Sequence, residues 1–354
     1  MPIHRHVLIA LILAGAALRV DAQGAAAPAT FTFRELAPGV LAAEVVPRPP
    51  HYAFANSLVV DLGDGLLVVD TQQSPDAARA LIGELRNRWA VPVRWVVNTH
   101  WHGDHVLGNS AYRDAWPDVR LIGHMSHPED IATRTREQVE RDLATLPAGI
   151  AQAEEWLQTG NGPSGNPLTE TQRTSLRRSL SMRQAQLAML RDVRLVPPDE
   201  LVADSLTIRG TTRSVQILAM GPAHTRGDII VWLPEERTLA AGDLVEDAWP
   251  WLDGADITGW RVALDRILAL RPRLVLPSHG TLWQAPVPRL QSQQALFAAA
   301  ERASCAVGGA VPPPPRELDR FATTLILPPS NATAFWQSLV RAARATASCA
   351  GGQP

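Results

Sequence analysis

Hydrophobic residues follow two spacings along this chain. Short continuous apolar runs are typical of buried strands, and apolar residues that recur every three or four positions are typical of amphipathic helices. The strand-like runs are residues 40–46, 57–62, 66–70, 93–97, 121–123, 215–220, 238–241 and 273–276. Helical spacing is found at residues 75–89, 258–270 and 286–304. Because strands and helices interleave, we predict an α/β sandwich in which helices cover sheets.

Residues 129–198 interrupt this alternation. Two helical runs, residues 130–158 and 169–192, flank a segment rich in glycine and proline at residues 160–167. The pattern predicts an antiparallel helical hairpin inserted between the two halves of the sandwich. We interpret the hairpin as a structural cover, with a lid over the functional site as the alternative.

The ends of the chain complete the predicted organisation. A single large domain is expected over residues 31–300, including the hairpin, and a C-terminal extension over residues 301–354. The extension crosses a stiff proline run at residues 312–315 before a last amphipathic helix at residues 331–346.

The first 22 residues have the pattern of a secretory signal. Arg5 precedes an apolar stretch at residues 7–18, and Val20 and Ala22 fit a small-x-small cleavage site. The stretch is shorter than the roughly 20 residues that span a bilayer as a helix. We therefore predict a periplasmic or secreted protein, with no stable membrane insertion after the signal is removed.

The chain has two cysteines, Cys305 and Cys349. Neither lies in a metal-ligand spacing or beside a catalytic partner. In an oxidising compartment such a pair can form a disulfide, which we predict here, and two unrelated buried thiols are the alternative.

Composition excludes one class of partner and limits how substrates are held. The net charge is −2, with 19% charged residues, so no basic surface points to nucleic acid, and a small-molecule substrate is expected instead. All 33 basic residues are arginine, because the sequence contains no lysine. A carboxylate on a substrate would have to be held by arginine, a backbone amide or a metal.

The largest group of metal-capable side chains follows the apolar run at residues 93–97. There the sequence reads HxHxDH, with His100, His102, Asp104 and His105 as the polar members. A strand sends alternate side chains to opposite faces, so these four can reach one target only where the strand ends and a helix begins. Such a cluster costs desolvation and repulsion unless a cation compensates it. Histidine and carboxylate without thiolate suit zinc, with iron or manganese as alternatives.

Three more metal-capable residues lie at predicted strand ends beside glycine or proline. His224 follows residues 215–220, Asp243 follows residues 238–241, and His279 follows residues 273–276. Two nearby histidines, His124 and His127, lie outside this pattern and are interpreted as ordinary loop residues.

The metal-capable residues occur along the chain in the order HxHxDH, His, Asp, His. In this order the sequence resembles the metallo-β-lactamase superfamily, from about residue 39 to 290. The resemblance implies a four-layer αβ/βα sandwich. It also implies that His100, His102 and His224 hold a first metal, that Asp104, His105 and His279 hold a second, and that Asp243 bridges them. Two zinc ions are the expected cofactors.

The resemblance also separates branches of the family. His102 stands where the oxygen-reducing flavodiiron branch typically has glutamate, which argues against that chemistry. Asp243 stands where one major class of true β-lactamases has cysteine. By the same likeness Asp70 supports the metal loop without touching the ion. The alternative is that Asp70 only caps the helix that follows.

These features lead to a predicted function. We expect an exported dinuclear zinc hydrolase that attacks a small ester, lactone, thioester or amide with a metal-bridging hydroxide. Asp104 is expected to orient the hydroxide and to take a proton. The alternatives are a true β-lactamase, a mononuclear iron oxygenase of the same superfamily, and a metal-binding protein without catalysis.

Substrate contacts are predicted from position alone. His51 and Tyr52 precede the second strand run, and Trp249 and Trp251 follow Asp243. These aromatic residues are expected to flank the mouth of the site, with burial in irregular loops as the alternative. Arg226 is the nearest candidate for holding an anion.

Overall fold

The computed structural model describes residues 31–46, 55–305, 311–325 and 331–346. Its first sheet has seven strands in sequence order. The strands are β1 (Phe31–Ala37), β2 (Val40–Val45), β3 (Ser57–Asp61), β4 (Leu66–Val69), β5 (Val93–Val97), β6 (Arg120–His124) and β7 (Glu200–Val202). Pairing is antiparallel from β1 to β4 and parallel from β4 to β7.

The second sheet has five strands in the order β12-β11-β10-β9-β8. They are β8 (Ser205–Arg209), β9 (Ser214–Ala219), β10 (Ile229–Leu233), β11 (Thr238–Ala240) and β12 (Leu274–Leu276). Only the β11–β12 pair is parallel. Four strands are absent from the predicted runs. β1, β7 and β8 have no continuous apolar run, whereas β10 has one and was missed.

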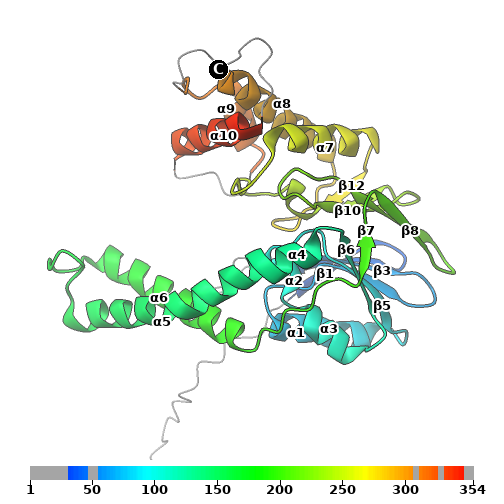
Figure 1. The fold of residues 1–354 in the computed structure, drawn as a ribbon, viewed down its shortest axis with the longest axis horizontal. Coiled ribbons are helices and arrows are strands. Elements are labelled where there is room, and N and C mark those ends of the chain that lie inside the picture. The colour runs from blue at the N-terminus through cyan, green and yellow to red at the C-terminus, as the bar shows by residue number, and fades with distance from the viewer. Residues whose placement is uncertain (1–30, 47–54, 306–310, 326–330, 347–354) are drawn as a thin grey trace, which may run out of the picture.

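Helices cover the outer face of each sheet (Figure 1). The helices α1 (Pro75–Arg88) and α3 (Asn109–Ala115) pack on the first sheet, and α7 (Ile257–Ala269) and α8 (Pro286–Ser304) pack on the second. A separate core fills the space between the sheets, with residues such as Val69, Val97 and Val231. The predicted four-layer αβ/βα sandwich is confirmed.

Local sequence explains why α1 forms where it does. The Ser74 side chain accepts a hydrogen bond from the Ala77 amide, and Pro75 occupies the first turn, where its missing N–H is not needed. Leu81, Ile82 and Leu85 are buried against the sheet. Burying each such side chain stabilises the fold by about 1.5–3 kcal/mol.

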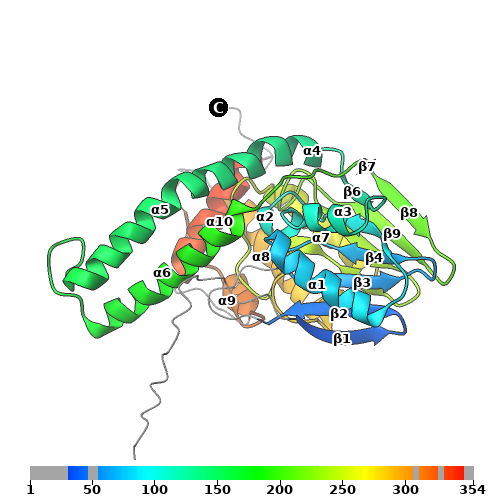
Figure 2. The same ribbon diagram turned by 90° about the horizontal axis from the view of Figure 1, so that it is seen from below.

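The predicted hairpin is present as α5 (Arg136–Thr159) and α6 (Glu170–Arg191). A short helix α4 (His127–Asp130) and a π-helical turn η1 (Ile131–Thr135) lead into it. Gly160, with φ of 77°, ends α5, and a capping box at Thr169 starts α6. The far half extends beyond the sandwich in both views (Figures 1 and 2). Among the described residues, the base of the hairpin packs on the sandwich and the far half projects from it, so the far half is not the surface cover expected from sequence.

The C-terminal residues continue the helical layer over the second sheet. Two helices, α9 (Arg316–Ala322) and α10 (Ala332–Thr346), pack beside α8, and α10 buries Trp336, Leu339 and Val340. The indole N–H of Trp336 donates to the carbonyl of Pro312 at 2.8 Å. The predicted last helix is therefore present and shares a core with α7 and α8.

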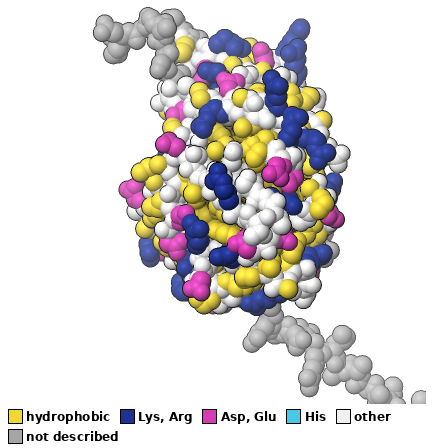
Figure 3. Space-filling model, turned by 90° about the vertical axis from the view of Figure 1, so that its right-hand side faces the viewer, with side chains coloured by type: hydrophobic (Ala, Val, Ile, Leu, Met, Phe, Trp, Pro, Cys, Tyr) yellow, Lys and Arg dark blue, Asp and Glu magenta, His cyan; other side chains and the backbone are white. Residues whose placement is uncertain are grey.

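On the face drawn in Figure 3, arginine side chains lie among acidic and hydrophobic ones. Among the described residues, no helix has the length and apolarity needed to span a bilayer. The predicted signal, residues 1–22, and Cys349 lie outside the described residues.

The hairpin shape generates a prediction about which part of it the site needs. Replacing residues 148–184 with a short Gly/Ser turn should leave the fold and the metal content unchanged, because it removes only the projecting half. The bond from the Gln186 side chain to Asp142, 2.8 Å long, would still join the two helices near their base. Circular dichroism and metal analysis of the purified variant check this. Loss of bound metal with an intact fold would contradict it.

Candidate metal centre

The HxHxDH motif lies at the predicted strand-to-helix turn. The buried strand β5 ends at Val97, His100 and His102 follow it, and α2 (Gly103–Val106) carries Asp104 and His105. The other three candidates come from the second half of the sandwich. His224 lies in the loop between β9 and β10, Asp243 in the turn η2 (Gly242–Leu244) after β11, and His279 after β12.

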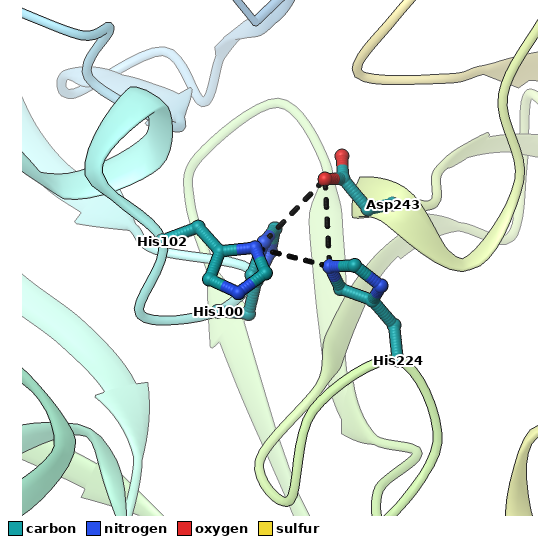
Figure 4. Close-up of side chains that lie close together, drawn as sticks. All are labelled: His100, His102, His224 and Asp243. Atoms are coloured by element: carbon teal, nitrogen blue, oxygen red, sulfur yellow. Dashed lines mark hydrogen bonds and ion pairs between the residues drawn. The ribbon is translucent and has the colours of Figure 1, made fainter. Parts of the chain in front are cut away.

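One group of ligand atoms forms around His100, His102, His224 and Asp243 (Figure 4). Nδ1 of His102 lies 3.1 Å from Nε2 of His224. Oδ2 of Asp243 lies 3.5 Å from Nε2 of His100 and 3.6 Å from Nε2 of His224. These are the residues that the resemblance assigned to a first metal and to the bridge.

A second group forms around Asp104, His105, His279 and the other oxygen of Asp243. Oδ2 of Asp104 lies 3.2 Å from Nε2 of His105 and 3.0 Å from Nε2 of His279. Oδ1 of Asp243 lies 3.4 Å from Nε2 of His105 and 3.6 Å from Nε2 of His279. Asp243 thus offers one oxygen to each group.

The geometry of both groups fits a metal ion. A tetrahedral zinc ion with bonds of about 2.0–2.1 Å separates its ligand atoms by about 3.3 Å. The seven distances given above lie between 3.0 and 3.6 Å. Nε2 of His100, Nε2 of His105 and Oδ1 of Asp243 are buried without a hydrogen-bond partner among the described residues. Buried polar atoms without partners are costly, and a cation would satisfy all three.

Charges within the two groups act strongly on one another. Burial lowers the pKa of His224 to about 3 and holds that of His100 well below its usual value. Burial also lowers the pKa of His105 and His279, but the charges of nearby aspartates, Asp104 and Asp243, outweigh it. The pKa of His279 rises to about 9. Without a cation, the second group therefore holds protons at neutral pH.

Asp70 supports histidines of both groups. Its carboxylate accepts hydrogen bonds from Nδ1 of His105 at 2.9 Å and from the Thr99 hydroxyl at 2.9 Å. The Thr99 oxygen lies 3.2 Å from Nδ1 of His100. Ser74, rather than Asp70, caps the helix that follows. Asp70 therefore has the contacts of a residue that orients ligands, and not those of a helix cap.

A network that sequence reasoning missed holds the His279 loop. The backbone N–H of Asp247 donates to the His279 carbonyl at 3.0 Å. The buried Asp247 carboxylate accepts hydrogen bonds from the Thr281 backbone and hydroxyl, the Trp283 indole and Arg289. No motif marks Asp247, because its partners are assembled only by the fold.

Glu246 is a second residue that the sequence did not single out. It follows Asp243 by three positions and is only 8% exposed. Its Oε1 has no hydrogen-bond partner among the described residues. Burial, and then the charge of Asp243, raise the pKa of Glu246 to about 8. A buried carboxyl without an ion-pair partner among the described residues thus lies close to the second group.

The four aromatic residues predicted to contact substrate differ in where they lie. His51 and Tyr52 lie outside the described residues. Trp249 stacks on Phe335 with ring centroids 4.1 Å apart, so it belongs to the core of the helical layer, as in the alternative interpretation. Trp251 is 63% exposed, and its carbonyl lies 3.2 Å from Nδ1 of His224.

Arg226 has other partners than an anionic substrate. Its guanidinium lies 2.9 Å from both carboxylate oxygens of Asp130, and it also contacts Glu129. His127 is not an ordinary loop residue either, because it is fully buried and bonded to the loop that carries His224.

Comparison with known proteins places this site in a family. Residues 53–279 match the family model described as the metallo-beta-lactamase superfamily. The chain is 22% identical over 235 residues to a linear primary-alkylsulfatase of Pseudomonas sp. (strain ATCC 19151), a match that covers 63% of this chain and 40% of the relative. It is 32% identical over 103 residues to the type 2 metallo-beta-lactamase of Bacteroides fragilis, covering 27% of this chain and 41% of the relative. The chain therefore spans about two-fifths of the length of the curated relatives it matches.

Solved structures share the fold at low sequence identity. The inverting sec-alkylsulfatase Pisa1 from Pseudomonas sp. gives a TM-score of 0.59 at 16% identity, over 89% of this chain and 50% of that one. A metallo-beta-lactamase from Pontibacter korlensis gives a TM-score of 0.50 at 18% identity, over 76% of this chain and 99% of that one. The resemblance expected from the ligand motif is confirmed.

The raised pKa of His279 predicts how metal binding depends on pH. A ligand histidine must be neutral, so at neutral pH the His279 proton has to leave when zinc binds. Zinc affinity should rise from pH about 7 to about 9 and change less above that, because protons compete only below the pKa of about 9. Calorimetric zinc titrations in buffers of different ionisation enthalpy measure the released protons. Zinc binding without proton release at neutral pH would contradict the prediction, and the His124→Asn variant, outside both groups, should behave like the parent.

Proposed function

The chain belongs to the metallo-β-lactamase superfamily, and we propose that it is an exported dinuclear zinc hydrolase of small esters, lactones, thioesters or amides. Sulfate esters join this list, because relatives named alkylsulfatases match the chain in sequence and in fold. The observation that carries the proposal is the shared carboxylate of Asp243, which offers one oxygen to each of two adjacent ligand groups.

Two ions would be held by the two groups. His100, His102 and His224 would hold one, Asp104, His105 and His279 the other, and Asp243 both. When bound, such a pair supplies a water-derived nucleophile at neutral pH and an electrophile for the substrate. The chain then needs no serine or cysteine nucleophile.

Asp104 is the residue best placed to act on the attacking water. Burial raises the pKa of Asp104, but the nearby charges of His105 and His279 outweigh burial and hold the pKa well below its usual range. The carboxylate therefore stays ionised and can accept a hydrogen bond from the water and orient it. Asp70 bonds Nδ1 of His105, the ring nitrogen that faces away from the other ligands, and so fixes the direction of the ligand ring instead.

The charges around the site limit where an anionic substrate group can bind. The sequence has no lysine, and the one candidate arginine, Arg226, is paired with Asp130. Glu246, beside the second group, offers no positive charge either, because its raised pKa of about 8 keeps it mostly neutral at neutral pH. An anionic group would therefore bind best at the metal pair itself, as a sulfate ester can.

True β-lactam cleavage remains the second candidate. The 32% identity to a metallo-beta-lactamase over 103 residues favours it. Against it, Asp243 stands where one major class of true β-lactamases has cysteine. No finding supports the mononuclear iron oxygenase, since both ligand groups are complete.

Metal content and activity test the dinuclear proposal together. The purified protein should bind close to two zinc ions, and Asp243→Ala should lower both the stoichiometry and the hydrolysis rate, because both groups lose an oxygen. Asp118→Ala, an exposed loop substitution, is the matched control. Hydrolysis is followed with nitrocefin, a lactone, a thioester, an alkyl sulfate and a phosphate ester. Full activity with at most one zinc ion bound would exclude the mechanism.

Export and a disulfide between Cys305 and Cys349 form the remaining part of the proposal. The leader pattern at residues 1–22 supports export, and an oxidising compartment would let the two cysteines pair. A native bridge of this kind typically stabilises a fold by about 2–4 kcal/mol. Expression of the full chain in a bacterium should give a periplasmic protein without titratable thiols. Two free thiols in the native protein, or retention in the cytoplasm, would count against it.

A further inference from the structure

The base of the helical hairpin contacts both halves of the metal centre. We call residues 127–135, which comprise α4 and η1, the root of the hairpin. On one side the root contacts the loop that carries His100 and His102, and on the other the loop that carries His224. None of its side chains is a predicted ligand.

The first contact is a hydrogen bond to the HxHxDH loop. The hydroxyl of Thr135, a fully buried residue, donates to the Trp101 carbonyl at 2.8 Å. Trp101 stands between two ligands, so this bond fixes the peptide that leads into His102. Ile131 packs in the same cluster as Trp101, and the Arg134 guanidinium lies 5.6 Å from the centre of its ring.

The second contact holds the His224 loop. Nε2 of the buried His127 lies 2.7 Å from the Gly227 carbonyl, and its Nδ1 accepts the backbone N–H of His124 at 3.1 Å. This pattern requires a neutral ring that carries its proton on Nε2. Gly227 leaves no room for a side chain, since a Cβ there would lie 2.4 Å from the Ser126 hydroxyl.

An ion pair strengthens the second contact. Asp130 is fully buried and accepts from Nε of Arg226 at 2.9 Å. Arg226 and Gly227 directly follow the His224 turn, so the root is joined to this loop by two side chains.

His102 is the ligand that depends most on these contacts. Three other ligand rings are held through their second nitrogen: His100 by Thr99, His105 by Asp70 and His224 by the Trp251 carbonyl. Among the described residues, no hydrogen bond reaches Nε2 of His102, and its Nδ1 faces His224 at 3.1 Å. The Trp101 ring packs edge-on against it, with ring centroids 4.3 Å apart. The orientation of the His102 ring therefore depends on Trp101 and on the backbone that Thr135 fixes.

We propose that the root is a clamp that sets the distance between the two loops of the first ligand group, with Thr135 and His127 as positioning residues for the metal. This inference rests on the proposed metal site but not on the identity of the substrate. It also assigns the hairpin a role that its projecting half does not have.

Three substitutions of neighbouring threonines test the clamp. Thr135→Val keeps the shape of the side chain and removes the hydroxyl, and Thr135→Ser restores it. Thr133→Val is the matched control, because the exposed Thr133 hydroxyl bonds the Glu129 carbonyl one turn earlier, at 2.8 Å, and no ligand loop among the described residues. Asp130→Asn weakens the contact with the other loop and serves if Thr135→Val does not fold.

The readout is zinc affinity, measured by competition with a chromophoric chelator, together with the visible spectrum of the cobalt-loaded protein. Loss of a hydrogen bond that orients a ligand typically lowers metal affinity about 10- to 100-fold. Thr135→Val should weaken one zinc site by about 10-fold or more and change the cobalt spectrum. Thr135→Ser should recover most of the affinity, Thr133→Val should match the parent, and Asp130→Asn should be weaker than the parent.

Two outcomes would overturn the clamp. One is unchanged zinc affinity in a folded Thr135→Val variant, or in Asp130→Asn where Thr135→Val does not fold. The other is an equal loss in Thr133→Val, which would reflect general destabilisation of the helix. A parent protein that binds a single zinc ion would contradict the dinuclear proposal, and the same variants would still test the clamp at that one site.

Discussion

Burial of charged and imidazole groups at one edge of the two sheets is the constraint on which the rest of this structure depends. His100, His105, His224 and Asp243 are almost inaccessible to solvent. Taking such groups out of water is costly unless they are paired or bind a cation. The distances between their ligand atoms fit a pair of metal ions that share Asp243. Metal binding therefore explains the structure at this edge as much as hydrophobic packing does.

The sandwich meets this constraint in two ways. The loops at the strand ends supply the ligands, and other residues form hydrogen bonds that orient those ligands. Parallel β4 and β5 place Asp70 beside the loop that follows β5, where one carboxylate reaches His105 directly and His100 through Thr99. Asp70 itself has a positive φ of 63°, an uncommon conformation for a residue other than glycine. Such strain persists only where surrounding contacts determine it, and the three hydrogen bonds on this carboxylate do so.

Much of the fold and the ligand set could be predicted from sequence, because both are encoded locally. The apolar runs correspond to buried strands, and the HxHxDH spacing needs only the turn after β5. The hairpin was predictable from its breakers and its helical period. What escaped prediction depends on residues distant in sequence: Asp247 acts through Thr281 and Trp283, and Trp249 is buried by Phe335. Arg226 looked available for a substrate because its partner Asp130 lies 96 positions earlier.

The same argument explains why an insertion can become part of a metal site without supplying a ligand. A new helix must satisfy its own polar groups and bury its apolar face. Here the loops around the metal centre offer carbonyls for the first purpose and the Trp101 side chain for the second. Thr135 bonds the Trp101 carbonyl, and His127 bonds the Gly227 carbonyl. A change in the position of the hairpin would therefore move the backbone that carries the ligands. His102 is the histidine of the first group whose second ring nitrogen has no hydrogen-bond partner among the described residues, so it is the ligand on which the hairpin would act most. The second ring nitrogen of His105 is instead held by Asp70.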